Sequence, residues 1–225
     1  MQRLRVRYAK RGRARFTSHR DFCRAFERAL RRADIPMAYS SGFSPHPRIS
    51  YANASPTGAA TEAEYLEIGL SEVCDPAKVR DALDAALPPG LDVVAVVAQV
   101  GQGGPSLTDL LEASLWRVDL VDAPTGALAD AVAGFLAESE VLVERMTKTG
   151  LRRFDARAAV VSLAVLGDHE LELVTRQGTP LVRPDDVVTA LRRLDARLSS
   201  DQPPMLVRLA QGPLAEGVPV DPIQG

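Results

Sequence analysis

The sequence of 225 residues predicts an α+β protein built from two similar halves, each with the element order βαββαβ. Three observations predict this class. Short segments alternate apolar and polar residues, as strands with one buried face do; longer segments repeat apolar residues at helical spacing; and the order of the segments in the first half returns in the second. In this plan, called ferredoxin-like, two helices cover one face of a four-stranded antiparallel sheet. We therefore expect two ferredoxin-like domains in tandem.

The first half supplies one complete set of elements. Leu4, Val6 and Tyr8 alternate with arginines and predict the first strand. Ser18, with Asp21 three residues later, has the spacing of a helix start, and apolar residues then recur at helical spacing as far as residue 33. The later elements are separated by turn residues: strands over 49–53 and 65–70, a helix over 75–87 and a strand over 91–100.

The second half repeats this pattern less regularly. We expect a strand over 115–121, a helix over 128–136, strands over 141–146 and 160–166, a returning strand over 170–175, a helix over 185–194 and a closing strand over 205–209. The glycine-rich stretch 101–106 is the natural linker. The predicted domains are thus 1–100 and 111–212, joined by a linker over 101–110 and followed by a flexible tail over 213–225.

Positive charge is concentrated near the start of the chain. The first 48 residues contain 13 arginines and lysines against 3 acidic residues, although the whole chain has a net charge of −2. Such asymmetry indicates a polyanionic partner such as nucleic acid. No apolar run is long enough to cross a membrane, and residues 1–15 are too charged for a signal peptide, so we expect a cytoplasmic protein.

Three groups of basic residues are candidate RNA contacts. One row would stand on the sheet face away from the helices, where RNA-recognition folds of this shape hold single-stranded RNA; the alternative is a ladder of ion pairs, with one between Arg5 and Glu67. A second row follows one face of the first helix through Arg20, Arg24, Arg28 and Arg31, and a basic loop around Gly12 joins the two. The predicted RNA-binding residues are Arg3, Arg5, Arg7, Lys10, Arg11, Arg13, Arg15, Arg20, Arg24 and Arg48.

The segment 39–48 is the most unusual local sequence. Its prolines hold the preceding residues in extended conformations, so we expect a stiff loop that presents its side chains. We assign no catalytic residue, and only His46 and His19 are candidates for acid–base chemistry. The alternative is that His46 bonds the backbone and Phe43 packs as an anchor. The loop residues of interest are Gly42, Phe43, Ser44, Pro45, His46 and Pro47.

Metal chemistry is not expected on this chain. Its two cysteines, Cys23 and Cys74, are too few for a disulfide framework or a closed zinc or iron–sulfur site. The second half adds one more basic cluster, which lies between two predicted strands and either faces the positive surface of the first domain across a cleft or forms a solvated hairpin. Its members are Arg145, Lys148, Arg152, Arg153 and Arg157.

Several motifs resemble those of one known family. They are Arg5-Val6-Arg7-Tyr8-Ala9-Lys10, Phe16-Thr17-Ser18-His19-Arg20-Asp21, Ala29-Leu30-Arg31-Arg32-Ala33, the loop from Tyr39 to Pro47, Glu64-Tyr65-Leu66 and, more loosely, Arg152-Arg153-Phe154-Asp155-Ala156-Arg157. Together they resemble the radical-SAM-linked family of uncharacterised bacterial proteins, most specifically over residues 3–70. Members of that family are fused to, or encoded beside, a radical SAM protein with a cobalamin-type domain.

The resemblance implies a non-catalytic accessory module that brings RNA, transfer or ribosomal, to such an enzyme. The chain has no Cys-x-x-x-Cys-x-x-Cys motif. An iron–sulfur cluster and S-adenosylmethionine are therefore expected only on the partner.

Two other functions stay open. The start of the first helix and the Gly-Phe-x-Pro loop also resemble the CRISPR repeat-processing endoribonucleases, although their glycine-rich C-terminal loop is replaced here by Ala210-Gln211-Gly212-Pro213. That resemblance implies metal-independent RNA cleavage. The third possibility is a scaffold whose arginines dock on an acidic protein surface; such binding would survive ribonuclease treatment.

Overall fold

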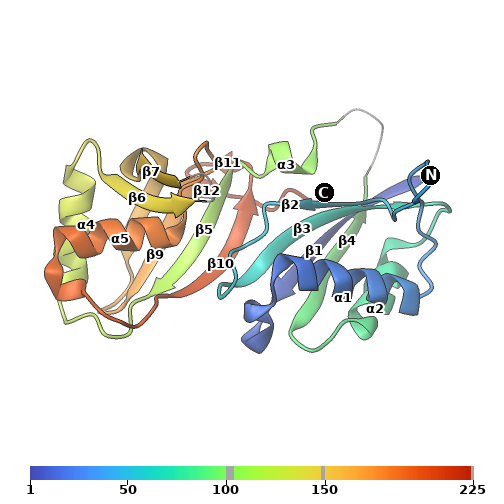
Figure 1. Ribbon diagram of the computed structural model, residues 1–225, viewed down its shortest axis with the longest axis horizontal. Coiled ribbons are helices and arrows are strands. Elements are labelled where there is room, and N and C mark those ends of the chain that lie inside the picture. The colour runs from blue at the N-terminus through green and yellow to red at the C-terminus, as the bar shows by residue number, and fades with distance from the viewer. Residues whose placement is uncertain (100–103, 148–149, 224–225) are drawn as a thin grey trace. The chain divides into compact units, whose positions relative to one another are not determined.

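The computed structural model describes residues 1–99, 104–147 and 150–223, and it is a mixed α+β structure with mostly antiparallel strands (Figure 1). The chain divides into two compact units. Unit 1 contains Met1–Leu111 and the C-terminal segment from Asp221, and unit 2 contains Glu112–Val220. No helix among the described residues is both long enough and apolar enough to span a membrane.

Unit 1 has four principal strands in one sheet, in the order β4-β1-β3-β2, and each strand is antiparallel to its neighbours. The elements along the chain are β1 (Gln2–Lys10), the 3-10 helix η1 (Gly12–Phe16), α1 (His19–Arg32), β2 (Ile49–Ala52), β3 (Ala60–Leu70), α2 (Pro76–Ala86), β4 (Leu91–Ala98) and the short α3 (Leu107–Leu110). Ser18 begins α1 by accepting a hydrogen bond from the Asp21 N–H, and Asp75 caps α2 in the same way through Ala77.

The main core of unit 1 lies between the sheet and the two long helices. The inward side chains of β1, Leu4, Val6 and Tyr8, pack against Phe22 and Phe26 of α1, with the Tyr8 and Phe22 rings stacked 4.3 Å apart. Side chains of α2 join the same cluster, so α1 and α2 cover one face of the sheet.

The sequence leads one to expect an open second face of this sheet, but part of that face is covered in the structure. A smaller cluster of buried residues packs on it, where Leu107 and Leu111, at and just after α3, and Ile223 near the C-terminus cover Ala63 and Tyr65 of β3. Figure 1 shows α3 above the strands of unit 1 and α1 below them. The predicted linker 101–110 therefore ends in a short helix whose first residue, Leu107, is buried; its residues 101–103 lie outside the described part of the chain.

Four strands of unit 2 pair in the order β10-β5-β9-β8, each antiparallel to its neighbours. Its elements are β5 (Ala113–Asp119), α4 (Ala127–Ala137), β6 (Leu142–Thr147), β7 (Gly150–Asp155), the 3-10 helix η2 (Arg157–Ala159), β8 (Val160–Val165), β9 (Glu170–Arg176), α5 (Pro184–Leu194), the 3-10 helix η3 (Ala196–Leu198), β10 (Met205–Gly212), β11 (Leu214–Ala215) and β12 (Val218–Pro219).

Two features of unit 2 and the C-terminus differ from the sequence prediction. The strand expected over 141–146 pairs with β7 in a separate two-stranded sheet, because the region read only as a basic cluster is itself a strand. Among the residues of β7 only Phe154 is buried, so that strand lacks the apolar alternation that would reveal it. The predicted flexible tail, 213–225, contains the paired strands β11 and β12 and then Asp221, whose side chain bonds residues of unit 1.

Candidate nucleic-acid interface

One face of α1 carries a row of exposed arginines. Residues 20, 24, 28 and 31 recur at the helical period, and the opposite face, with Phe22 and Phe26, is buried in the core. The acidic residues on the helix neutralise little of this charge. The distance from guanidinium nitrogen to carboxylate oxygen is 4.0 Å both between Arg24 and Asp21 and between Arg31 and Glu27, and these side chains are largely in solvent. The exposed arginines of η1 and α1, here called the α1 surface, are Arg13, Arg20, Arg24, Arg28, Arg31 and Arg32.

Several cations of the α1 surface have no acidic partner among the described residues. Within the described ranges of the chain, no carboxylate oxygen lies within 4.0 Å of the guanidinium groups of Arg20, Arg28 or Arg32. Arg28 and Arg32 also line a groove of about 500 Å³ whose apolar wall includes Leu87 and Pro88, just after α2. Phosphate and an apolar or aromatic group can therefore be held side by side here.

The short helix η1 extends the basic surface toward an exposed aromatic ring. The Arg15 guanidinium lies 4.7 Å from the centre of the Phe16 ring, and that ring is 59% exposed. Gly12 adopts a left-handed φ of +53°, which favours glycine and lets the chain turn sharply between β1 and η1. Phe16 is not among the predicted RNA-binding residues, because residue spacing does not reveal that its ring is exposed.

Arg5 and Arg7, two of the three arginines of β1, are engaged within unit 1. Arg5 Nε donates to Glu67 Oε1 at 3.2 Å, which is the cross-strand pair considered above, and its Nη2 donates to the Pro105 carbonyl at 2.9 Å. Arg7 Nη1 donates to Asp221 Oδ2 at 2.7 Å, and both side chains are at most 19% exposed. The prediction that Arg5 and Arg7 stand on an open phosphate-binding face is therefore wrong, because α3 and the C-terminal segment cover the part of the face that carries them.

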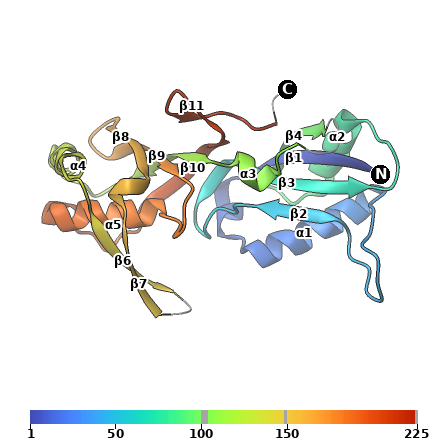
Figure 2. The same cartoon turned by 90° about the horizontal axis from the view of Figure 1, so that it is seen from above.

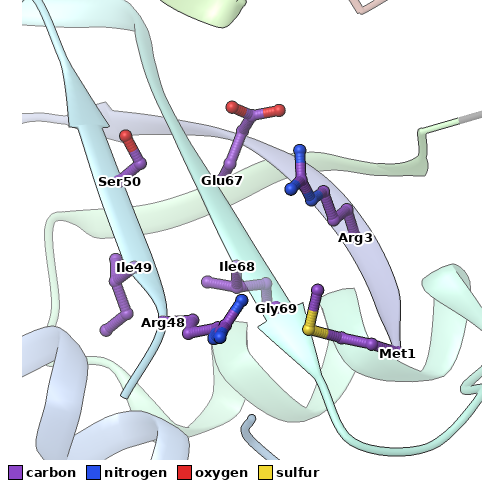
Figure 3. Close-up of a pocket in the computed structure, with 8 residues that line it drawn as sticks. All are labelled: Met1, Arg3, Arg48, Ile49, Ser50, Glu67, Ile68 and Gly69. Carbon is purple, nitrogen blue, oxygen red and sulfur yellow. The ribbon is translucent and has the colours of Figure 1, made fainter. Parts of the chain in front are cut away.

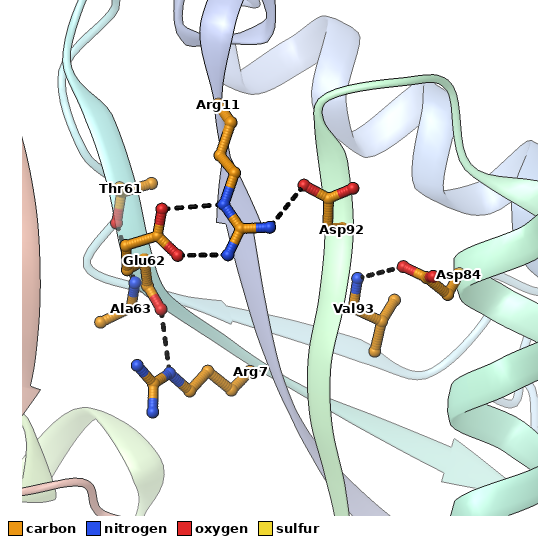
Figure 4. A network of polar contacts seen from close by, with 8 residues as sticks. All are labelled: Arg7, Arg11, Thr61, Glu62, Ala63, Asp84, Asp92 and Val93. Atoms are coloured by element: carbon orange, nitrogen blue, oxygen red, sulfur yellow. Dashed lines mark hydrogen bonds and ion pairs between the residues drawn. The ribbon is translucent and has the colours of Figure 1, made fainter.

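The end of β1 is held by a second polar network (Figure 4). Arg11 donates two hydrogen bonds to the Glu62 carboxylate, at 2.8 and 2.5 Å, and a third to Asp92 at 3.0 Å, so it ties β1 to β3 and β4. These carboxylates keep the pKa of Arg11 above its usual value. Lys10 is 5% exposed. The sequence predicts that both residues contact RNA. In the structure Arg11 bonds carboxylates of the neighbouring strands and Lys10 is buried.

The loop between α1 and β2 projects from unit 1, as Figure 2 shows. Its base is closed by two hydrogen bonds between Ser40 and the backbone of His46, at 2.9 and 3.0 Å, and by a bridge between Tyr39 and Pro47. Residues 41–46 are all exposed. Phe43 is fully exposed at the tip, so the alternative that it packs as an anchor is wrong.

The two histidines are not brought together. His46 lies in the projecting loop, whereas His19 begins α1 and meets Tyr51 edge-to-face at 5.3 Å. His19 Nε2 lies 3.6 Å from Cys23 Sγ. Burial raises the pKa of the Cys23 thiol and also that of the Tyr51 hydroxyl, so neither group is a ready nucleophile at neutral pH. Tyr51 belongs to this cluster although nothing in its sequence context indicated it.

The basic residues of the second half also have local roles. Arg145 donates to the buried Asp186 carboxylate at 2.5 Å, and its guanidinium lies 4.9 Å from the Phe154 ring centre. Arg152 and Arg153 are exposed on β7, whereas Lys148 lies outside the described residues. Within the described ranges, no three His, Cys, Asp or Glu side chains are grouped to hold a metal ion.

Comparison with known proteins gives a family without an assigned activity. No curated protein matches the chain. Among the matching solved structures is one of an unknown protein from Galdieria sulphuraria, 18% identical over 92% of this chain and 98% of that chain, with a TM-score of 0.29. A family model described as "Uncharacterized protein conserved in bacteria (DUF2344)" matches residues 3–184. Because this match spans most of the sequence, the chain belongs to the DUF2344 family of conserved bacterial proteins.

Proposed function

We propose that this chain is a non-catalytic, cytoplasmic RNA-binding module that works beside a radical SAM enzyme. Two ferredoxin-like domains, one in each unit, form the framework of the proposal. The observation that carries it is the α1 surface, where exposed arginines follow one helix face without effective neutralisation. A phosphodiester backbone is the polyanion that such a row of guanidinium groups fits best.

The RNA in this proposal is single-stranded. Phosphates lie along α1, and bases meet the apolar groove beside Arg28 and Arg32 or stack on the exposed Phe16 and Phe43 rings. Stacking on aromatic side chains is tolerant of sequence, because every base has a π-face. This places binding on the helical side of unit 1 rather than on the sheet face favoured by the sequence.

The link to a radical SAM partner rests on the resemblance of the motifs over residues 3–70. In this proposal the partner holds the iron–sulfur cluster and S-adenosylmethionine, while this chain supplies the RNA. Cleavage by the chain itself is less favoured, because His19 and His46 lie on separate elements and share no hydrogen bond or ring contact in the described part of the chain.

The experiment is an anisotropy titration of a fluorescent single-stranded RNA with the purified chain, at several salt concentrations and with EDTA present. Micromolar or tighter binding that weakens steeply with salt, without cleavage of the labelled RNA, is the expected result. Cleavage that is lost on His19→Ala or His46→Ala would support the endoribonuclease instead. Absence of RNA binding, together with ribonuclease-resistant capture of an acidic protein, would support the scaffold.

A further inference from the structure

A pocket of about 430 Å³ lies in unit 1, where residues of β1, β3 and the start of β2 come together (Figure 3). Its polar lining comes from Arg3 on β1, Arg48 and Ser50 beside and on β2, and Glu67 on β3. The strand register pairs residue 3 with Gly69 and Ser50 with Glu67, so these side chains share the sheet face away from α1 and α2.

The pocket has an excess of positive charge. Its one carboxylate, Glu67, already receives a hydrogen bond from Arg5. In the described part of the chain, no carboxylate oxygen lies within 4.0 Å of the guanidinium group of Arg3 or Arg48. Arg48 uses its Nε to donate to the Tyr39 carbonyl at 3.2 Å, which fixes the side chain and leaves both terminal nitrogens available to a ligand.

Glycine at position 69 keeps this pocket open. A Cβ there would lie 3.2 Å from Arg48 Cβ and 3.6 Å from its Cδ, so any larger residue would press on the arginine stem. The Gly69 backbone is fully used, since its N–H donates to the Arg48 carbonyl and its own carbonyl accepts from Ala38. The strand therefore leaves space for Arg48 to lie across it, as Figure 3 shows.

The lining fits a phosphate attached to a hydroxylated body. Two guanidinium groups bind phosphate through several charged hydrogen bonds, whereas the Ser50 hydroxyl and the second oxygen of Glu67 suit sugar hydroxyls. The volume lies within the range of small-molecule sites, about 300–1,000 Å³, and exceeds the needs of inorganic phosphate alone. We propose that this pocket binds a nucleoside 5′-monophosphate group, either as a free nucleotide or as the 5′ end of an RNA. It is separate from the α1 surface and does not depend on it.

The test is titration calorimetry of the full chain with adenosine 5′-monophosphate and with adenosine. We expect the nucleotide to bind and the nucleoside to bind at least about tenfold more weakly. Arg3→Gln and Arg48→Gln should each weaken nucleotide binding by about tenfold or more, and Gly69→Ala should weaken it by displacing Arg48. Unfolding midpoints of the arginine variants should match the parent chain, because both side chains are exposed.

Two further arms separate the sources of the phosphate. A short RNA with a 5′-phosphate that binds more tightly than its 5′-hydroxyl twin, in an Arg3- and Arg48-dependent way, would assign the pocket to RNA ends. Preference for the mononucleotide alone would assign it to a free ligand, and either result supports the site. The triple change Arg20→Gln, Arg24→Gln and Arg28→Gln should leave nucleotide affinity unchanged, which separates this site from the RNA-binding proposal. Equal affinity for nucleotide and nucleoside, or affinity unaffected by both pocket arginines, would overturn the proposal.

Discussion

Neutralising three arginines of the α1 surface should reduce RNA affinity and its salt dependence together. The change is Arg20→Gln, Arg24→Gln and Arg28→Gln in one chain; all three side chains are exposed, so the fold should be retained. If α1 makes five phosphate contacts, log K should fall with log salt at a slope near −3.5, since each contact to a single strand contributes about −0.7. Removing three contacts lowers the slope to about −1.4, which corresponds to roughly a 100-fold loss of affinity at 0.1 M salt.

The assay is fluorescence anisotropy with a single-stranded RNA between about 0.05 and 0.3 M salt. The matched control replaces three exposed arginines elsewhere, Arg80→Gln, Arg117→Gln and Arg176→Gln, and so changes the net charge by the same amount. We expect the control to stay close to the parent chain. An unchanged slope in the α1 variant, or an equal loss in the control, would refute the argument that the charge acts through this helix face.

Four further outcomes test the fold and the site. Arg7→Met should lower the free energy of unfolding by about 2 kcal/mol in a urea titration, because it leaves the partly buried Asp221 carboxylate without its cation; an unchanged midpoint would contradict the role given to this pair. Gly90→Ala should cost about 2 kcal/mol or more in the same assay, since φ is +86° and the new Cβ would lie 2.8 Å from a backbone oxygen. With its raised pKa, Cys23 should be alkylated by iodoacetamide at pH 8 more slowly than in the urea-unfolded chain, measured in a Cys74→Ser background; equal rates would contradict its burial. Phe43→Ala should leave the midpoint unchanged and weaken single-stranded RNA binding by about fivefold or more, whereas full affinity would remove Phe43 from the interface.

The regular elements of unit 1 could be predicted because each leaves a periodic signal. Leu4, Val6 and Tyr8 face the core as their alternation indicates, and α1 begins at the serine cap. The element β7 left no such signal, since Arg152 and Arg153 are exposed and only Phe154 is buried. A strand with so few inward side chains is stabilised mainly by its pairing with β6. The composition of a single strand does not indicate with which strand it pairs.

The covering of the sheet's second face was beyond sequence reasoning for a different reason. It depends on contacts between distant segments: Leu107 and Ile223 meet the face that carries Arg7 and Tyr65, and Asp221 bonds both of those side chains. A segment rich in proline and glycine is normally a loose terminus. The local sequence of this segment does not indicate that Asp221 pairs with Arg7, which is partly buried and lies more than two hundred residues earlier in the chain.

Pairing with carboxylates determines which arginines contribute to the positive charge at the protein surface. Arg5, Arg7 and Arg11 are each paired with a carboxylate, so the β1 end of the basic segment is largely neutralised inside unit 1. The charge that remains effective lies on the α1 surface, where the two acidic neighbours stand 4.0 Å away in solvent, and in the pocket of Arg3 and Arg48. Long-range attraction to a polyanion depends on net local charge, whereas paired cations contribute little to it. The basic segment is therefore divided: Arg5, Arg7 and Arg11 hold the sheet and its covering segments together, whereas the helix arginines supply the exposed charge on which the RNA-binding proposal rests.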